Sequence, residues 1–263
     1  MLYFMLLLLG AAVLLSAVGI LPYNAWDIFV QTILFVVLCK IANALIAHSF
    51  KITPNVESSI ITGLILAAIT GPLSLTRDWP ILLIMASAAM ASKYIFAIRH
   101  SHIFNPAAFG AVVAGLLGYS ASWWIGNRVL LPLVLVGGVL VLYKIRRLHL
   151  VVSFLVAYIG LSVLDVLFLQ SGSFPQTVIL LNTLLFSSSL FFFSFVMLVE
   201  PLTSPQTKTR RVYFGTVIGA VFFAFQWFAS QIPFSLELSL LIGNILSRII
   251  NADFRQSFTL RER

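Results

Sequence analysis

Apolar residues occur in ten long runs that are separated by short polar segments. Each run has roughly 17 to 25 residues, enough for a helix to cross a hydrocarbon core of about 30 Å. No soluble domain fits between the runs, so the pattern predicts an all-α polytopic membrane protein with about ten transmembrane helices. The ten predicted helices cover residues 2–20, 28–48, 56–73, 79–97, 105–124, 128–144, 149–169, 177–199, 211–230 and 234–250.

Composition supports a membrane protein. Of the 263 residues, 60% are hydrophobic and 9% are charged, and the mean hydropathy is +1.06, outside the range of soluble domains. A signal peptide is an alternative interpretation of residues 2–20, but these residues lack the basic leader of such peptides. The single Cys39 excludes a disulfide framework and a cluster held by four thiolates. We expect Cys39 to be a small buried side chain.

Basic residues are concentrated in alternate loops. With ten crossings, only Arg77 and Arg128 fall on one side, which also carries Trp26, Trp79, Trp123, Trp124 and Trp227. The positive-inside rule then predicts that both termini are cytoplasmic and that the tryptophans lie near the outer interface. The net charge of +8 is explained by anionic lipid headgroups, and nucleic acid is not an expected partner. The basic side carries Lys51, Arg99, Lys144, Arg146, Arg147, Lys208, Arg210, Arg211, Arg255, Arg261 and Arg263.

Ten helices divide into two halves of five, which we place at about 1–124 and 128–250. An odd number of helices in each half predicts that the halves are inverted relative to one another, as in many transporter-like folds. The best internal correspondence is Ser58-Ser59 with Gly63 against Ser187-Ser188-Ser189, small residues that let helices approach closely. We therefore expect a transmembrane domain over 1–250 and a basic tail over 251–263.

Polar residues gather at one helix start, in "RHSHIFNPAAFG". Asn105 is a good N-cap and Pro106 suits the first helical turn, so a helix is predicted to begin here with free backbone N–H groups. Such an end attracts anionic or electron-rich atoms. The alternative is an ordinary capped helix that follows a loop. Similarly, Glu200 before Pro201 is either solvated at a helix end or points inward as an acceptor.

Several other polar residues lie within the apolar runs. Lys40 is close enough to a helix end to snorkel, although an intramembrane charge also suggests a functional site. Asp165 and Glu237 are expected at outer, interfacial helix ends. The four histidines do not favour haem, because they fall at inner helix ends or loops. The amides Asn43, Asn182, Gln226 and Asn244 are expected to bind neighbouring helices.

Three ordered blocks resemble a known membrane family. They are "PNVESSIITGLILAAITGP" from Pro54, "SKYIFAIRHSHIFNPAAFG" from Ser92 and "FFFSFVMLVEPLTSPQT" from Phe191. The family contains a membrane component of the Rnf electron-transport complex and its counterpart in sodium-translocating NADH:quinone reductase. Its members carry a Ser/Thr helix like "ALILALTLPP", a lysine followed by "FNPA", and "FFMATDPVTSP". The resemblance implies two inverted five-helix halves, similar to urea and ammonium channels, in the bacterial cytoplasmic membrane.

The same resemblance implies a flavin cofactor. Relatives hold FMN covalently through the threonine of a Ser/Thr-Gly-Ala-Thr motif, and "GYSASWWIGNRV" from Gly118 lacks that motif. We therefore expect no covalent FMN, no haem and no iron-sulfur cluster, and a noncovalent flavin, riboflavin or FMN, among the helices. A flavin ring needs apolar walls, hydrogen bonds and nearby positive charge. The candidate cofactor-binding residues are Ser58, Thr62, Lys93, Phe104, Asn105, Pro106, Glu200 and Thr203.

Each candidate has an expected role. The polar part of the site would come from Lys93, the Asn105 amide and the helix start at Pro106. Hydroxyl groups would come from Ser58, Thr62 and Thr203, and Phe104 would supply a stacking ring. Lys93 has an alternative role, snorkelling from its helix end.

The tail "FRQSFTLRER" from Phe254 alternates apolar and polar residues, a weak strand pattern. It resembles the first strand of the FAD-binding module of ferredoxin-NADP reductases. A basic juxtamembrane tail is the alternative. The preferred function is electron transfer from a cytoplasmic FAD- or NAD(P)H-linked reductase, in cis or in trans, through the flavin to quinone or across the membrane. The alternative is a small-solute or ion channel with the same fold and no redox cofactor.

Overall fold

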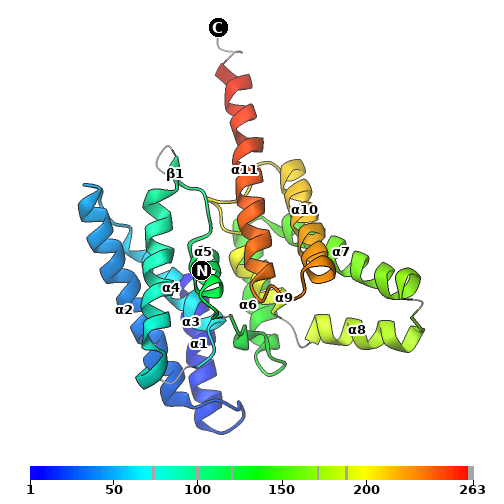
Figure 1. Ribbon diagram of the computed structural model, residues 1–263, viewed down its shortest axis with the longest axis horizontal. Coiled ribbons are helices and arrows are strands. Elements are labelled where there is room, and N and C mark those ends of the chain that lie inside the picture. The colour runs from blue at the N-terminus through cyan, green and yellow to red at the C-terminus, as the bar shows by residue number, and fades with distance from the viewer. Residues whose placement is uncertain (73–74, 99–100, 120, 171, 187–188, 260–263) are drawn as a thin grey trace.

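The computed structural model describes residues 1–72, 75–98, 101–119, 121–170, 172–186 and 189–259. These residues are mostly helical (Figure 1). The first half contains α1 (Leu2–Ala17), α2 (Ala25–Ser49), α3 (Val56–Ile69), α4 (Leu75–Ile95), β1 (Ala97–Ile98), β2 (Ser101–His102) and α5 (Pro106–Leu116). The second contains η1 (Trp124–Gly126), α6 (Leu131–Ile145), α7 (Leu148–Leu164), η2 (Asp165–Leu169), α8 (Phe174–Phe186), α9 (Leu190–Phe192), η3 (Phe193–Met197), α10 (Lys208–Phe228) and α11 (Ser235–Thr259).

Each of the ten apolar runs contains a helix, but two of the predicted helices are wrong in part. The helix predicted over 105–124 ends at Leu116, because Gly118 and Trp123 take positive φ values of 89° and 50°. The chain then turns back, and the backbone N–H groups of Ser122 and Trp123 donate to the Ile69 carbonyl at the end of α3. The helix predicted over 177–199 is instead α8 followed by α9 and η3, bent by 53°. Ser187 and Ser188 lie outside the described residues.

The described helices suit a lipid bilayer, although not all of them are long. Three are long and apolar enough to cross it, Ala25–Ser49, Leu148–Phe168 and Lys208–Phe228, and the bent pair α8 with α9 and η3 is a fourth candidate. Shorter apolar helices are α1, α3, α5 and α6. Large apolar side chains remain exposed on the outer faces of the helices, among them Leu14, Leu45 and Val156. Such a surface is expected where lipid is the solvent. The chain is therefore a multi-pass, all-α membrane protein.

The helices of the two halves occupy different sides of the bundle. Figure 1 shows α2 and α4 on one side and α7, α8 and α10 on the other, with α5 and α6 between them. The inverted relation of the halves and the side on which the termini lie stay predictions. Arg99, Arg261 and Arg263, which enter the charge argument, lie outside the described residues, as does His100.

One continuous apolar core joins both halves. α1 contributes Met5, Leu8 and Ala12, each fully buried, so residues 2–17 pack into this core as a helix. Cys39 is fully buried, as expected. α2 and α3 approach closely at Gly63, where a Cβ atom would lie 2.8 Å from Val36 Cα. Glycine therefore allows these helix backbones to touch.

Three residues near helix ends are more buried than exposed interfacial side chains would be. The exposed fractions of Asp165 and Glu237 are 7% and 0%, and their depth in the bilayer stays a prediction. Trp124 is also buried, and its indole N–H donates to the Ala67 carbonyl at 2.8 Å. Trp26, by contrast, is exposed as an interfacial residue would be.

The last described residues, up to Thr259, are helical. α11 continues to Thr259, so a strand over 254–259 is wrong, and residues 260–263 lie outside the described part. Figure 1 shows that α11 extends beyond the other helices. The boundary at residue 250 between a membrane domain and a tail stays a prediction.

Candidate functional site

The N-terminal ends of the short helices α3 and α5 meet the turn that follows η3. This turn carries Glu200 and Thr203 and is called the Glu200 turn below. α3 has 14 residues and α5 has 11, which correspond to lengths of about 21 and 16 Å. The first residues of α5, Pro106, Ala107 and Ala108, are buried. This helix therefore starts inside the protein, whereas β1, in the segment before it, is exposed, and the alternative of an ordinary capped helix that follows a loop stays open.

Both helix starts are capped by asparagine. Asn55 Oδ1 accepts the backbone N–H of Ser58 at 3.0 Å, and Asn105 Oδ1 accepts that of Ala108 at 3.0 Å. The cap predicted at Asn105 and the proline at the first helical position are confirmed. The remaining N–H groups of a first turn have no intrahelical acceptor, so each start carries partial positive charge.

A cavity of about 310 Å³ lies between these two helix starts and the turn. Five of the eight predicted site residues line it, namely Ser58, Thr62, Asn105, Pro106 and Glu200. Its apolar wall includes Ile61, Ile65, Val196 and Leu202. The first, second and third sequence blocks thus all contribute to one cavity, although they are far apart in the chain.

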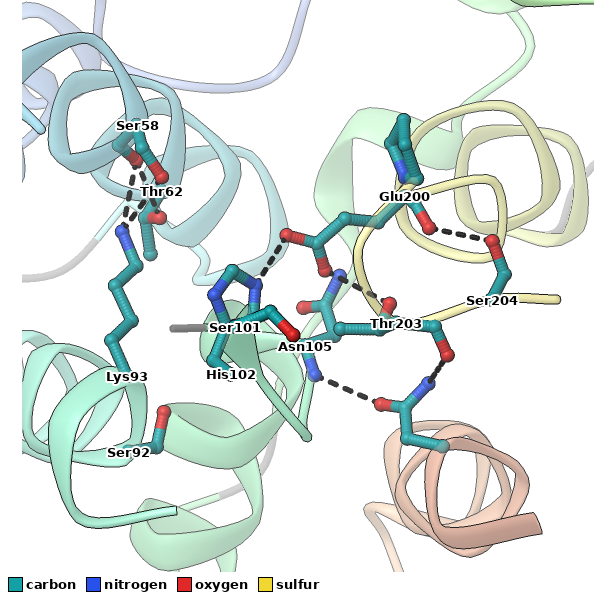
Figure 2. Close-up of polar contacts among 12 residues, drawn as sticks. Ser58, Thr62, Ser92, Lys93, Ser101, His102, Asn105, Glu200, Thr203 and Ser204 are labelled. Atoms are coloured by element: carbon teal, nitrogen blue, oxygen red, sulfur yellow. Dashed lines mark hydrogen bonds and ion pairs between the residues drawn. The ribbon is translucent and has the colours of Figure 1, made fainter. Parts of the chain in front are cut away.

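Lys93 approaches this cavity from α4. Its Nζ donates to the Ser58 carbonyl at 3.2 Å and to Ser58 Oγ at 3.1 Å (Figure 2). Thr62 Oγ1 donates to the same carbonyl at 2.8 Å. Lys93 does not itself line the cavity, but its ammonium group contacts a residue that does. It is directed at α3 and not at the end of its own helix, which disfavours snorkelling.

Glu200 points inward. Its Oε1 accepts the Nε2–H of His102 at 3.0 Å, and its Oε2 accepts the Thr203 hydroxyl at 3.1 Å (Figure 2). The side chain of His102 is 8% exposed and that of Glu200 is 22% exposed. The sequence leaves open whether Glu200 is solvated or an internal acceptor, and this arrangement supports the second interpretation. Sequence reasoning misses His102, because it considers the histidines only as haem ligands.

Asn244 connects three segments of the site. Its Oδ1 accepts the backbone N–H of Asn105 at 2.8 Å, and its Nδ2 donates to the Thr203 carbonyl at 3.3 Å. Asn105 Nδ2 in turn donates to the Met197 carbonyl at 3.3 Å. Both polar atoms of the Asn105 side chain therefore have protein partners, and this amide positions α5 against η3. The expected helix contact of Asn244 is confirmed, with α5 and the turn as its partners.

Phe104 lies apart from the cavity. Its ring packs against Phe96 and Phe109, with centroid distances of 5.4 and 5.7 Å. It is not among the residues that line the cavity. A stacking role for Phe104 stays a prediction that this packing does not favour.

Basic side chains fix the turn that carries Glu200 and Thr203. Arg147 is buried, and its Nη1 donates to Ser204 Oγ. Ser204 Oγ donates to the Glu200 carbonyl at 2.6 Å. Arg211 Nε donates to the Pro205 carbonyl at 3.0 Å. Burial and the neighbouring Arg211 lower the pKa of Arg147 to about 10, so Arg147 stays charged at neutral pH.

The site therefore offers hydroxyls, two helix starts and the carboxylates of Glu57 and Glu200 around an apolar wall, with the Lys93 ammonium group behind Ser58. Within the described ranges no three His, Cys, Asp or Glu side chains are grouped as a metal ion would need. The polar groups are suited to bind a planar organic molecule with several acceptor atoms.

Comparison with known sequences identifies the family. The sequence model of the NQR2, RnfD, RnfE family matches residues 112–259, more than half of the chain. A comparison with curated proteins gives no match. The matched region contains Glu200, Thr203 and Asn244. The N-terminal ends of α3 and α5, which line the same cavity as Glu200, lie before the matched region in the sequence. The chain belongs to the NQR2, RnfD, RnfE family of membrane proteins, which are involved in electron transport.

Proposed function

We propose that this protein is an integral membrane electron-transfer component that binds a noncovalent flavin in the cavity between α3, α5 and the Glu200 turn. In this proposal electrons come from a cytoplasmic NAD(P)H- or ferredoxin-linked reductase, in cis or in trans, and leave to quinone or across the membrane. The supporting observation is that all three family-like blocks meet at one cavity of about 310 Å³.

The cavity fits the needs of a flavin ring. Its volume is within the roughly 300 to 1,000 Å³ of small-molecule sites. Ile61, Ile65 and Val196 supply apolar walls. Lys93, Ser58 and the first turns of α3 and α5 supply hydrogen-bond donors and positive charge at one edge. When bound, the flavin supplies redox chemistry that these side chains lack.

The residues of the site have distinct tasks in this proposal. Lys93 and the two helix starts supply positive charge, which favours electron-rich ligand atoms, and Glu57 lies at the rim of the α3 start. Glu200 supplies negative charge from the turn, and its bonds to His102 and Thr203 fix its position. Apolar side chains of α3 limit access of water to the ring. Asn105 and Asn244 hold the parts together.

An absorption spectrum tests the proposal. The purified protein should show bands near about 370 and about 450 nm that dithionite bleaches. Lys93→Met should lower the flavin content several-fold, because it removes the cation beside Ser58. The matched control is Lys40→Met, since Lys40 is exposed on α2 and should not affect flavin content. A colourless wild-type preparation would refute the proposal, and solute transport by such a preparation would support a channel instead.

A further inference from the structure

Glu237 is a carboxyl group enclosed in the interior of the bundle, apart from the site described above. It lies in the first turn of α11 and is 0% exposed. Trp123 Nε1–H donates to its Oε1 at 3.0 Å. No described residue provides a hydrogen-bond partner for its Oε2.

The surroundings of Glu237 lack a compensating charge. α11 packs against α10 and α5, and Trp123 packs against Phe192 and Phe193. The segments 106–126, 189–199 and 214–234 contain no Asp, Glu, Lys, Arg or His, and their one titratable side chain is the half-exposed Tyr119. The other titratable residues of α10 are Lys208, Arg210, Arg211 and Tyr213, which lie in its first two turns, at the opposite end of α10 from the loop that leads to α11. On α11 itself the first basic residue after Glu237 is Arg248, eleven positions later and about 16 Å along the helix.

An isolated carboxylate is strongly disfavoured in such surroundings, because it loses its hydration and gains no countercharge. A neutral carboxylic acid suits the observed contacts better. Its carbonyl oxygen would be Oε1, which accepts the indole N–H, and its hydroxyl would be Oε2. An uncharged O–H group without a partner costs much less than a carboxylate without one.

We infer that Glu237 is a proton-binding site within the membrane domain, which holds a proton taken from water on Oε2 at neutral pH. The inference does not depend on the flavin proposal. Glu237 and Asn244 are seven residues apart, so they lie on the same face of α11 about 10 Å apart along its axis. The bound proton is therefore two helical turns from the candidate site.

Infrared spectroscopy of the full-length protein tests this inference. The wild type at neutral pH should show the C=O stretch of a protonated carboxyl group, and the band should shift in D₂O. Glu237→Gln should lose that band, since it keeps the shape of the neutral acid without its proton. Asp27→Asn is the control, because Asp27 is partly exposed and should not contribute. Absence of the band from the wild type overturns the inference.

Two further outcomes would also overturn it. If Asp165→Asn lost the band and Glu237→Gln kept it, the proton would be assigned to the buried carboxyl group of Asp165. A carboxylate band of Glu237 that responds to sodium concentration would identify a bound cation in place of a proton.

A stability measurement gives independent evidence. The folded chain would keep a proton that the unfolded chain releases, so wild-type stability should fall as pH rises above the ordinary titration range of glutamate, near about 4 to 5. Glu237→Gln should show a smaller fall in melting temperature between about pH 6 and about pH 8.5. An equal fall in both proteins overturns the inference.

Discussion

Replacement of Gly63 by alanine tests the close contact between α2 and α3. The added Cβ would lie 2.8 Å from Val36 Cα, 2.9 Å from Phe35 O and 2.9 Å from Val36 N. All three are backbone atoms, so no side-chain rotation can relieve the overlap. The helices must separate instead.

The size of the effect follows from these distances. Ordinary van der Waals contact begins near 3.4 Å, so α3 must move from α2 by about 0.6 Å. Overpacking of this kind costs about 1 to 3 kcal/mol. For a chain of this size that corresponds to a melting temperature lower by about 2 to 12 °C.

Cys39 provides the assay. It is the single cysteine of the chain and is fully buried on α2, one turn after Phe35. A thiol-reactive dye should therefore react when α2 loses its packing, both during heating and slowly in the native state. Gly63→Ala should lower the temperature of the dye transition and increase the native-state labelling rate.

Gly10→Ala is the matched control. A Cβ at Gly10 meets nothing within 4 Å, so this variant should melt at or slightly above the wild-type temperature, since alanine favours the helix. If Gly63→Ala labels and melts like the wild type, the close α2–α3 contact is refuted. If Gly63→Ala and Gly10→Ala lose stability equally, the space around each glycine does not determine the effect of the added methyl group, and the reasoning is refuted.

Three further predictions concern the site and its supports. Asn244→Leu should cost about 2 to 4 kcal/mol, because it leaves a buried N–H and a buried carbonyl without their partner; Asn182→Leu, which removes one exposed hydrogen bond from Arg128, should lower the melting temperature much less in the same dye assay. His102→Phe should lower flavin content per mole of protein at least two-fold, because the carboxylate of the turn loses its donor, and unchanged absorbance would contradict this role. Gly219→Ala should cost about 1 to 3 kcal/mol, since its Cβ would lie 2.8 Å from a backbone oxygen of α7, whereas Gly160→Ala, which has open space, should not lower the melting temperature.

Features set by neighbouring residues in the chain could be predicted from the sequence. The cap at Asn105 with Pro106 depends on contacts within three residues, and the structure has it as expected. The apolar runs likewise placed the helices, because lipid requires apolar side chains on any exposed face. The end of the helix at Leu116 differs from the predicted end at residue 124, because Gly118 adopts a positive φ that the apolar pattern does not indicate.

Features set by contacts between distant segments could not be predicted in the same way. The sequence predicts Glu237 at an outer helix end. Its burial involves a contact with Trp123, a distant residue whose left-handed backbone conformation brings the indole N–H to the carboxyl group. The partnership of His102 with Glu200 spans 98 positions, and no local pattern indicates it. Phe104 lies beside two residues of the cavity wall in sequence, yet its ring packs against Phe96 and Phe109.

The bridging position of Asn244 has a consequence for biosynthesis. Chains leave the ribosome N-terminus first, so the α3 and α5 starts are inserted well before residue 244 is translated. Until α11 arrives, the backbone N–H of Asn105 and the carbonyl of Thr203 lack their native partner. A nascent or prematurely terminated polypeptide would thus expose an incomplete site, which only the last helix completes.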